Sequence, residues 1–175
     1  AERLRTAGIE VSLFVDPDAK RIDALAPFSG GLASGIELNT DAYTRAVGGF
    51  AASRRAEVAR SADMGAAMGF RIYAGHGLTA ANVGGIAAIR RIEELNIGHA
   101  LISRAVILGL AGAVREMLQA MGTARDASRA AAAGPRAGRR RRAVAEARVG
   151  AGARARPLPG RPGRVDPGPL ARAYA

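Results

Sequence analysis

The sequence predicts an α/β fold in which parallel strands alternate with helices. Short apolar or β-branched runs, bounded by glycine, proline or aspartate, alternate with longer periodic or alanine-rich segments, and the connections between them are short. Two of the short runs end in a glycine and a histidine, in AGHG and NIGHA. Because strands joined through helices run parallel, both histidines should lie at the edge of the sheet where the strands end.

Four strand–helix units can be assigned along the chain. The expected strands are 9–15, 35–39, 70–74 and 94–97. The expected helices are 2–7, 18–25, 48–68, 82–89 and 103–121, the last ended by Gly122. Right-handed crossovers leave two arrangements open, a doubly wound sheet or part of a (β/α)8 barrel. Four units would be half of such a barrel, with two sheet edges that must be covered or paired.

The composition divides the chain at about residue 122. Ala, Arg, Gly and Pro make up 42 of the 53 residues in 123–175, which leaves too few large apolar side chains for a core. This segment holds 13 arginines and 3 acidic residues and therefore carries +10 of the net charge of +11. We expect a folded domain over 1–122 and a disordered basic tail over 123–175, in which 125–133 and 139–148 could form helices and 157–169 could not.

The arginines of the tail, including the run Arg139–Arg142, could neutralise the phosphates of nucleic acid or of an anionic lipid. The tail has one aromatic residue, Tyr174, and so lacks a stacking platform for single strands. A solvated tail is therefore favoured over a nucleic-acid-binding one. A third interpretation is that GC-rich DNA is translated out of frame here, and the encoding DNA would decide it.

Several classes of chemistry find no support in the sequence. The absence of cysteine excludes disulfides, thiol chemistry and a cysteine-ligated metal. There is no Walker loop, no GxGxxG after a strand and no HExxH helix, so neither a metal nor a cofactor is expected. No apolar run approaches the ~20 residues of a membrane helix, and the N-terminal segment lacks a signal-peptide layout. A cytoplasmic location is the default expectation.

His76 is the first candidate site residue. It follows a predicted strand, and a neutral imidazole near pH 7 suits general acid–base chemistry. The glycines on both sides of it would let a substrate approach the backbone closely. The alternative is a loop histidine that caps the next helix, and the spacing alone leaves both interpretations open.

Two further candidates lie at or near strand ends. Gly98 and His99 precede the last predicted helix, whose first N–H groups would suit a phosphate, although the glycine could simply serve a tight turn. Glu37 lies within an apolar strand, where a carboxylate is costly unless it is paired. An inward-facing Glu37 would be a site residue, whereas one that faces a helix or an edge would be a surface acid.

The series AGIEVSLFVDPD, IELNTDAY, AGHGLTAANV and ELNIGHALISRAVILGL resembles the C-terminal half of the pyridoxine 5'-phosphate synthase family of vitamin B6 biosynthesis, over residues 1–121. The resemblance implies the C-terminal half of a (β/α)8 TIM barrel and a homo-oligomer. It also implies phosphorylated small-molecule substrates, because the family condenses 3-amino-2-oxopropyl phosphate with 1-deoxy-D-xylulose 5-phosphate and releases phosphate and water.

The resemblance also implies roles for single residues. His76 would be the general acid that serves the leaving groups, and Gly77 beside it would contact substrate. Gly98 and His99 would line a phosphate site. Glu37 would stabilise charge in the transition state.

The chain departs from the family in ways that bear on activity. The first four strands of the family, with its catalytic bases, have no counterpart here, so turnover should require a complementary N-terminal half. Asn39 and Asp41 stand where the family commonly has a ring residue and a glycine, and Tyr73 replaces an asparagine and should bring a phenol close to the site. The alternatives to a synthase are a non-catalytic fragment and a basic-tailed nucleic-acid-binding module.

Overall fold

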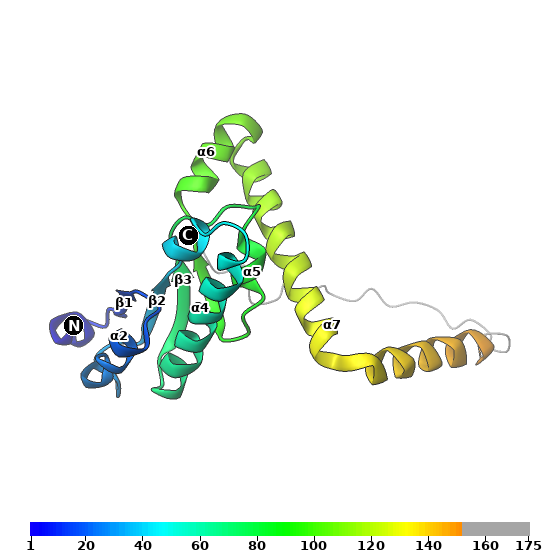
Figure 1. Ribbon diagram of the computed structural model, residues 1–175, viewed down its shortest axis with the longest axis horizontal. Helices are drawn as coiled ribbons and strands as arrows, with labels where there is room; N and C mark the ends of the chain where they lie inside the picture. The colour runs from blue at the N-terminus through cyan, green and yellow to red at the C-terminus, as the bar shows by residue number, and fades with distance from the viewer. Residues whose placement is uncertain (152–175) are drawn as a thin grey trace, which may run out of the picture. The chain divides into compact units, whose positions relative to one another are not determined.

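The computed structural model describes the backbone of residues 1–151 and the side chains of residues 1–132 (Figure 1). The chain separates into two units, Ala1–Ala132 and Ala133–Ala175, and all of the strands described belong to the first. The arginine run 139–142 and the segment 157–169 lie outside the residues described with side chains. The nucleic-acid-binding role considered for the tail concerns these residues and stays a prediction.

Four parallel strands form one sheet in the order in which they occur along the chain. They are β1 (Ser12–Val15), β2 (Gly35–Asn39), β3 (Arg71–Gly75) and β4 (Ile92–Asn96). The predicted α/β class and the parallel arrangement are confirmed, and β2 has the predicted bounds. Since all four strands run the same way, their C-terminal ends lie along one edge of the sheet, which is where both histidines follow.

Most of the helices that precede, join or follow the strands are short, and two of them have 18 and 42 residues. They are α1 (Glu2–Thr6), α2 (Ala19–Asp23), the 3-10 helix η1 (Ala26–Phe28), α3 (Asp41–Thr44), α4 (Phe50–Ala67), α5 (Val83–Ala87), α6 (His99–Leu108) and α7 (Leu110–Ala151). Asp18 caps α2 as expected for an N-cap, because its carboxylate accepts hydrogen bonds from the backbone N–H groups of Lys20 and Arg21. Helix α3 was not predicted, since one turn leaves no periodic signal in the sequence.

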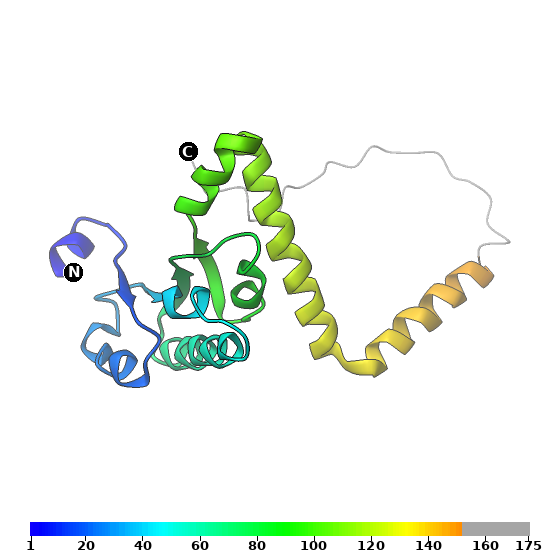
Figure 2. The same cartoon turned by 45° about the horizontal axis from the view of Figure 1, so that its top comes forward.

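One face of the sheet packs against the helices (Figure 2). Ile36 and Leu38 of β2 and Ile72 of β3 are almost fully buried on this face, together with Val58 of α4 and other side chains from α2, α5 and α7. Gly65 of α4 makes the approach of α4 to the sheet possible, because a Cβ there would collide with the Cδ1 atoms of Ile36 and Ile72. The hydrophobic core therefore lies between the sheet and its helices.

The alternation along each strand directs the remaining side chains to the opposite face. Glu37 and Tyr73 are register neighbours on this face, and Tyr73 packs over Gly35, where a Cβ would meet the phenol ring. Phe14 of β1 lies beside Glu37 in register and remains 58% exposed. This face is therefore not covered by the residues described.

The prediction of a single helix over 103–121 is wrong at both ends. Helix α6 begins at His99, and Gly109, with φ of 71°, separates it from α7. A positive φ is inexpensive for glycine, so the chain can turn here between two helical segments. Helix α7 then continues through Gly122, because one glycine within a helix costs only about 1 kcal/mol.

Contacts beyond Gly122 help to explain why α7 continues. The Arg125 guanidinium donates to the carbonyl oxygens of Ala87 (3.2 Å) and Ile92 (3.3 Å), and the Ser128 hydroxyl donates to the carbonyl of Ala88 (3.2 Å). These bonds attach α7 to the connection between α5 and β4. The first compact unit consequently extends to Ala132, ten residues past the expected boundary at 122.

Across the residues that the structure describes, no helix is both long enough and apolar enough to cross a bilayer.

Candidate functional site

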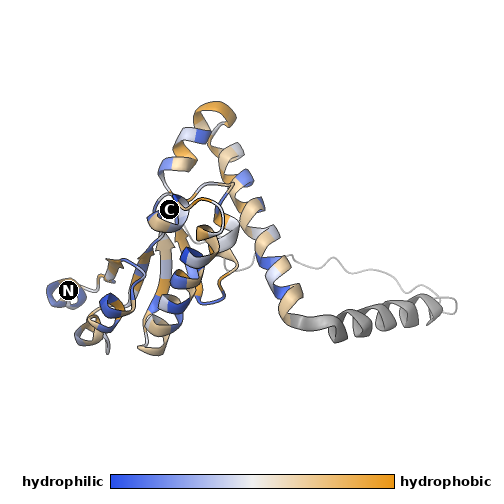
Figure 3. Cartoon of the chain, in the orientation of Figure 1, coloured by the Kyte–Doolittle hydropathy of each residue, from blue (hydrophilic) through white to orange (hydrophobic). Residues whose placement is uncertain are grey.

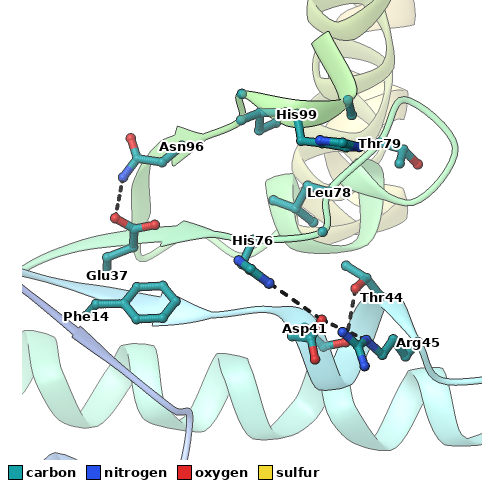
Figure 4. Close-up of a pocket in the computed structure, with 14 residues that line it drawn as sticks. Phe14, Glu37, Asp41, Thr44, Arg45, His76, Leu78, Thr79, Asn96 and His99 are labelled. Atoms are coloured by element: carbon teal, nitrogen blue, oxygen red, sulfur yellow. Dashed lines mark hydrogen bonds and ion pairs between the residues drawn. The ribbon is translucent and has the colours of Figure 1, made fainter. Parts of the chain in front are cut away.

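A cleft of about 530 Å³ opens at the C-terminal ends of the strands (Figure 4). All five site residues expected from the sequence line it, and they come from three strand ends. These residues are Glu37, His76, Gly77, Gly98 and His99. Residues more than 60 positions apart in the sequence therefore share one cavity, because the parallel sheet brings the ends of β2, β3 and β4 together.

The ends of β2 and β3 are joined by a strand-end clamp, formed by Thr40, Gly75 and His76. Thr40 is fully buried, and its backbone N–H donates to the carbonyl of Gly75 (2.8 Å). Its hydroxyl oxygen lies 2.7 Å from the carbonyl oxygen of Gly75 and 2.6 Å from that of His76, so the hydroxyl proton is shared between the two. These bonds fix the backbone from which the His76 ring projects.

The backbone of His76 has φ of 81°, the only positive value for a non-glycine residue in the part of the chain described. Its ring lies edge-on to Phe14, with the centroids 6.4 Å apart. Nε2 lies 3.7 Å from a carboxylate oxygen of Asp41, and the same oxygen forms an ion pair with Nε of Arg45 at 2.9 Å (Figure 4).

Asn82 holds the loop that follows His76. Asn82 accepts a hydrogen bond from the backbone N–H of Thr79 at 2.8 Å, and its own carbonyl accepts one from the Tyr43 hydroxyl at 2.8 Å. Burial raises the pKa of the Tyr43 phenol, which therefore remains a donor at neutral pH. The His76 side chain is directed at Asp41 and is not used to cap the next helix.

Two glycines next to His76 are required by close contacts. A Cβ at Gly75 would collide with the Glu37 carboxylate, and one at Gly77 would collide with the Thr44 hydroxyl. Gly77 also has φ of 74°, which any other residue adopts only with strain. The glycines thus allow the ends of β2 and β3 to approach each other, as well as keeping the entrance to His76 open.

Glu37 lies on the central strand β2 and faces away from the helices. Its Oε2 accepts a hydrogen bond from the side-chain amide of Asn96, at the end of β4, at 2.7 Å. The carboxylate is therefore partnered and directed toward the cleft, as the inward-facing interpretation requires. The phenol of Tyr73 does not line the cleft, although it was expected close to it; burial raises its pKa, and the nearby Arg71 guanidinium opposes that effect.

Gly98 and His99 form the start of α6. Gly98 precedes the first helical residue, and the backbone N–H of Ile102 donates to its carbonyl at 3.0 Å. The N–H groups of the first turn have no acceptor within the helix, so they are available to an anion. No side chain of α6 is buried, in contrast to the side chains that surround the strand-end clamp.

Sequence reasoning missed the residues that support the expected ones. Thr40, Asn96 and Arg45 were not selected, and Asp41 was noted only as a departure from a family pattern. The polar run Asn39–Asp41 directly after an apolar strand was the available signal, because polar residues at such positions face the C-terminal edge of the sheet.

Comparison with known proteins identifies the family. The family model described as "Pyridoxal phosphate biosynthesis protein PdxJ" matches residues 1–123. A pyridoxine 5'-phosphate synthase from Synechococcus sp. (strain JA-2-3B'a(2-13)) is 48% identical over 123 residues, which are 69% of this chain and 49% of the relative. Those from Thermosynechococcus vestitus and Sulfurihydrogenibium sp. are 48% and 43% identical, over 66% and 70% of this chain and 48% and 49% of the relatives.

The chain thus spans about half the length of the curated relatives it matches. The match ends at residue 123, just before the part of α7 that carries Arg125 and Ser128. Since the family model covers well over half of the chain, this protein belongs to the family of pyridoxal phosphate biosynthesis proteins PdxJ.

Proposed function

We propose that residues 1–123 are the C-terminal half of a (β/α)8 barrel that acts as a pyridoxine 5'-phosphate synthase. Four parallel strands in sequential order, with the described core on one face, support this arrangement. The opposite face, with Phe14 exposed, would then become the barrel interior. An N-terminal half would pair with the edges of β1 and β4 and complete the barrel.

The proposed reaction is the condensation of 3-amino-2-oxopropyl phosphate with 1-deoxy-D-xylulose 5-phosphate. The observation that carries the proposal is the gathering of Glu37, His76 and the N-terminus of α6 around one cleft in a chain of this family. Both substrates bear a phosphate, for which the first N–H groups of α6 and His99 offer donors. No cofactor or metal takes part in the proposed scheme.

Each residue has one proposed role. His76 protonates the groups that leave as phosphate and water, and its exposed ring can reach a substrate in the cleft. Glu37 stabilises the positive charge that develops during condensation, since its carboxylate is already oriented by Asn96. Gly77 provides the close approach to substrate, and Gly98 and His99 hold a phosphate.

Turnover requires the N-terminal half in this proposal, because the catalytic bases of the family are not among these residues. We also propose that the completed barrel assembles into a homo-oligomer, as the resemblance to the family implies. The partners are therefore an N-terminal half-barrel, further copies of the same protein and the two phosphorylated substrates.

The test is complementation in vitro. The full chain is mixed with the N-terminal half of the Synechococcus relative, and pyridoxine 5'-phosphate is quantified by chromatography. The mixture should form product, whereas this chain alone should form none. His76→Gln should lower the rate about 100-fold or more, because general acid catalysis contributes on that order. Arg90→Gln, on the exposed connection before β4, is the matched control and should leave the rate unchanged.

The two halves of the relative, produced separately and mixed, serve as the positive control. If they form product while this chain supports none, although gel filtration shows it bound to the N-terminal half, the proposed activity is wrong. Equal rates for the wild-type chain and His76→Gln would leave the activity intact and contradict the role of His76.

A further inference from the structure

Asp41 lies where its carboxylate can influence the orientation of the His76 ring. It directly follows Thr40, whose hydroxyl contacts the carbonyl oxygen of His76 at 2.6 Å. The carboxylate of Asp41 reaches the other end of the same residue, with Oδ1 3.7 Å from Nε2 of the ring. Two consecutive residues at the end of β2 therefore contact both the backbone and the side chain of His76.

The position of the Asp41 carboxylate is itself determined by neighbouring groups. Its backbone N–H donates to Oδ1 of Asn39 at 3.0 Å, and its carbonyl accepts a hydrogen bond from the Thr44 hydroxyl at 3.0 Å. The Nε atom of Arg45, one turn later, forms an ion pair with the same carboxylate oxygen that lies near His76. The carboxylate is 30% exposed and bridges a guanidinium and an imidazole at the wall of the cleft.

We infer that Asp41 is a positioning residue for His76, which holds the ring with a proton on Nε2 and presents Nδ1 to the substrate. At 3.7 Å the two atoms are beyond direct hydrogen-bond length, so the carboxylate acts through its negative charge, which favours the ring form in which the facing nitrogen carries hydrogen. The ring then keeps its Nε2 proton in both charge states, and the proton exchanged with substrate is the one on Nδ1. The aspartate that orients the histidine of a hydrolytic triad acts in the same way from the opposite nitrogen.

This inference rests on the proposed function for the identity of the substrate, but the ring geometry can be tested without turnover. The chain contains only two histidines, so the full chain labelled with ¹⁵N-histidine gives two sets of ring signals, and His76→Gln assigns them. The ¹⁵N shifts of Nδ1 and Nε2 report the ratio of the two neutral ring forms.

Asp41→Asn is the principal variant. An amide carries no net charge, so the preference for the proton on Nε2 should weaken and the ratio should fall at least about twofold, the size expected for a solvent-accessible ion pair. Asp41→Ser serves as a second variant that also suits the start of a helix, should the first disturb α3. Asp63→Asn is the matched control, since it removes a carboxylate that pairs with Arg91 at 2.9 Å far from the cleft.

Arg45→Gln separates the two partners of Asp41. If the carboxylate serves only Arg45, this variant leaves the His76 ratio unchanged and Asp41→Asn does so too, which would overturn the inference. If Asp41 positions His76, removal of the competing guanidinium should preserve or increase the ratio. An equal change in Asp63→Asn would also overturn it, because the effect would then be one of net charge.

In the complemented enzyme, Asp41→Asn should lower kcat about tenfold and leave KM within about twofold, because only the orientation of the acid is altered. A change confined to KM would contradict a positioning role. Failure of the complementation itself would concern the proposed function and not this inference, since the ring signals of the chain alone would still give their answer.

Discussion

The two sides of the cleft are attached to the molecule in different ways. His76 and Glu37 project from the central strands, beside the fully buried Thr40 and its hydrogen bonds to β3. Gly98 and His99 begin α6, which buries no side chain and exposes Val106 and other apolar residues along its length (Figure 3). One half of the site is therefore built into the core, and the other half is not.

Helix α6 is attached through one partly buried side chain, Leu101, which packs against the core, and through polar surface contacts. Nε and Nη2 of Arg104 donate to the two carboxylate oxygens of Glu116 on α7, at 2.7 and 3.0 Å. A ten-residue helix is marginal in water by itself, and exposed ion pairs add little. Buried contacts within this chain thus determine the position of His76, whereas few buried contacts hold the N-terminus of α6. Under the proposed function, an N-terminal half would supply further contacts to α6.

The largest expected effect tests this contrast in stability. Ile72→Ala removes a side chain that is 1% exposed in the core of β3 and should lower the free energy of unfolding by about 2–5 kcal/mol. Ile102→Ala makes the same change on α6, where the side chain is 63% exposed, and should alter it by less than about 0.5 kcal/mol. Urea unfolding measures both, and similar losses for the two variants would contradict the comparison.

A smaller effect is expected for the strand-end clamp. Thr40→Val removes the hydroxyl from a buried site and should cost about 1–3 kcal/mol, because the His76 carbonyl loses its donor and the Gly75 carbonyl keeps only the backbone N–H of Thr40. Amide exchange at 75–77 should become faster in this variant. Thr123→Val is the control, because its hydroxyl bonds the Gln119 carbonyl at 3.0 Å on an exposed helix surface. The clamp has no structural importance if the two variants are equally stable.

The smallest expected effect concerns the ion pair between Arg104 and Glu116 at low pH. The hydrogen bond from Arg104 lowers the pKa of the Glu116 carboxyl below its usual 4.5. A lowered pKa in the folded state means that the pair contributes above the unfolded pKa, and that the contribution disappears as the pH falls through the folded value. The Nε–H signal of Arg104 should therefore move toward its free position below about pH 4.5.

In Glu116→Gln the Arg104 signal should depend far less on pH, while the global unfolding midpoint at neutral pH remains that of the wild-type chain. Rapid loss of the whole fold at the same pH would show that α6 is coupled to the core, and it would remove the contrast between the two sides of the cleft.

Local pattern was sufficient to locate the four strands and to select residues that line the cleft. The bounds of β2 follow from a short apolar run between a glycine-rich loop and polar residues, and Glu37, His76 and Gly98 lie at or near strand ends whose meeting point is dictated by parallel pairing. The helix ends at Gly109 and beyond Gly122 were not accessible in this way. Whether a glycine ends a helix depends on what the following residues contact, and for Arg125 those partners lie more than 30 positions away.

Sequence information was thus enough to predict the α/β class, four parallel strands and the edge of the sheet that carries the candidate site, because these follow from periodicity and from the direction of strands joined through helices. The three-dimensional structure was needed to show that Thr40 and Asp41 contact His76, that Glu37 is paired with Asn96, and that α6 buries no side chain. Those are distances between segments 35 to 59 residues apart, and they depend on how the sheet and its helices pack together.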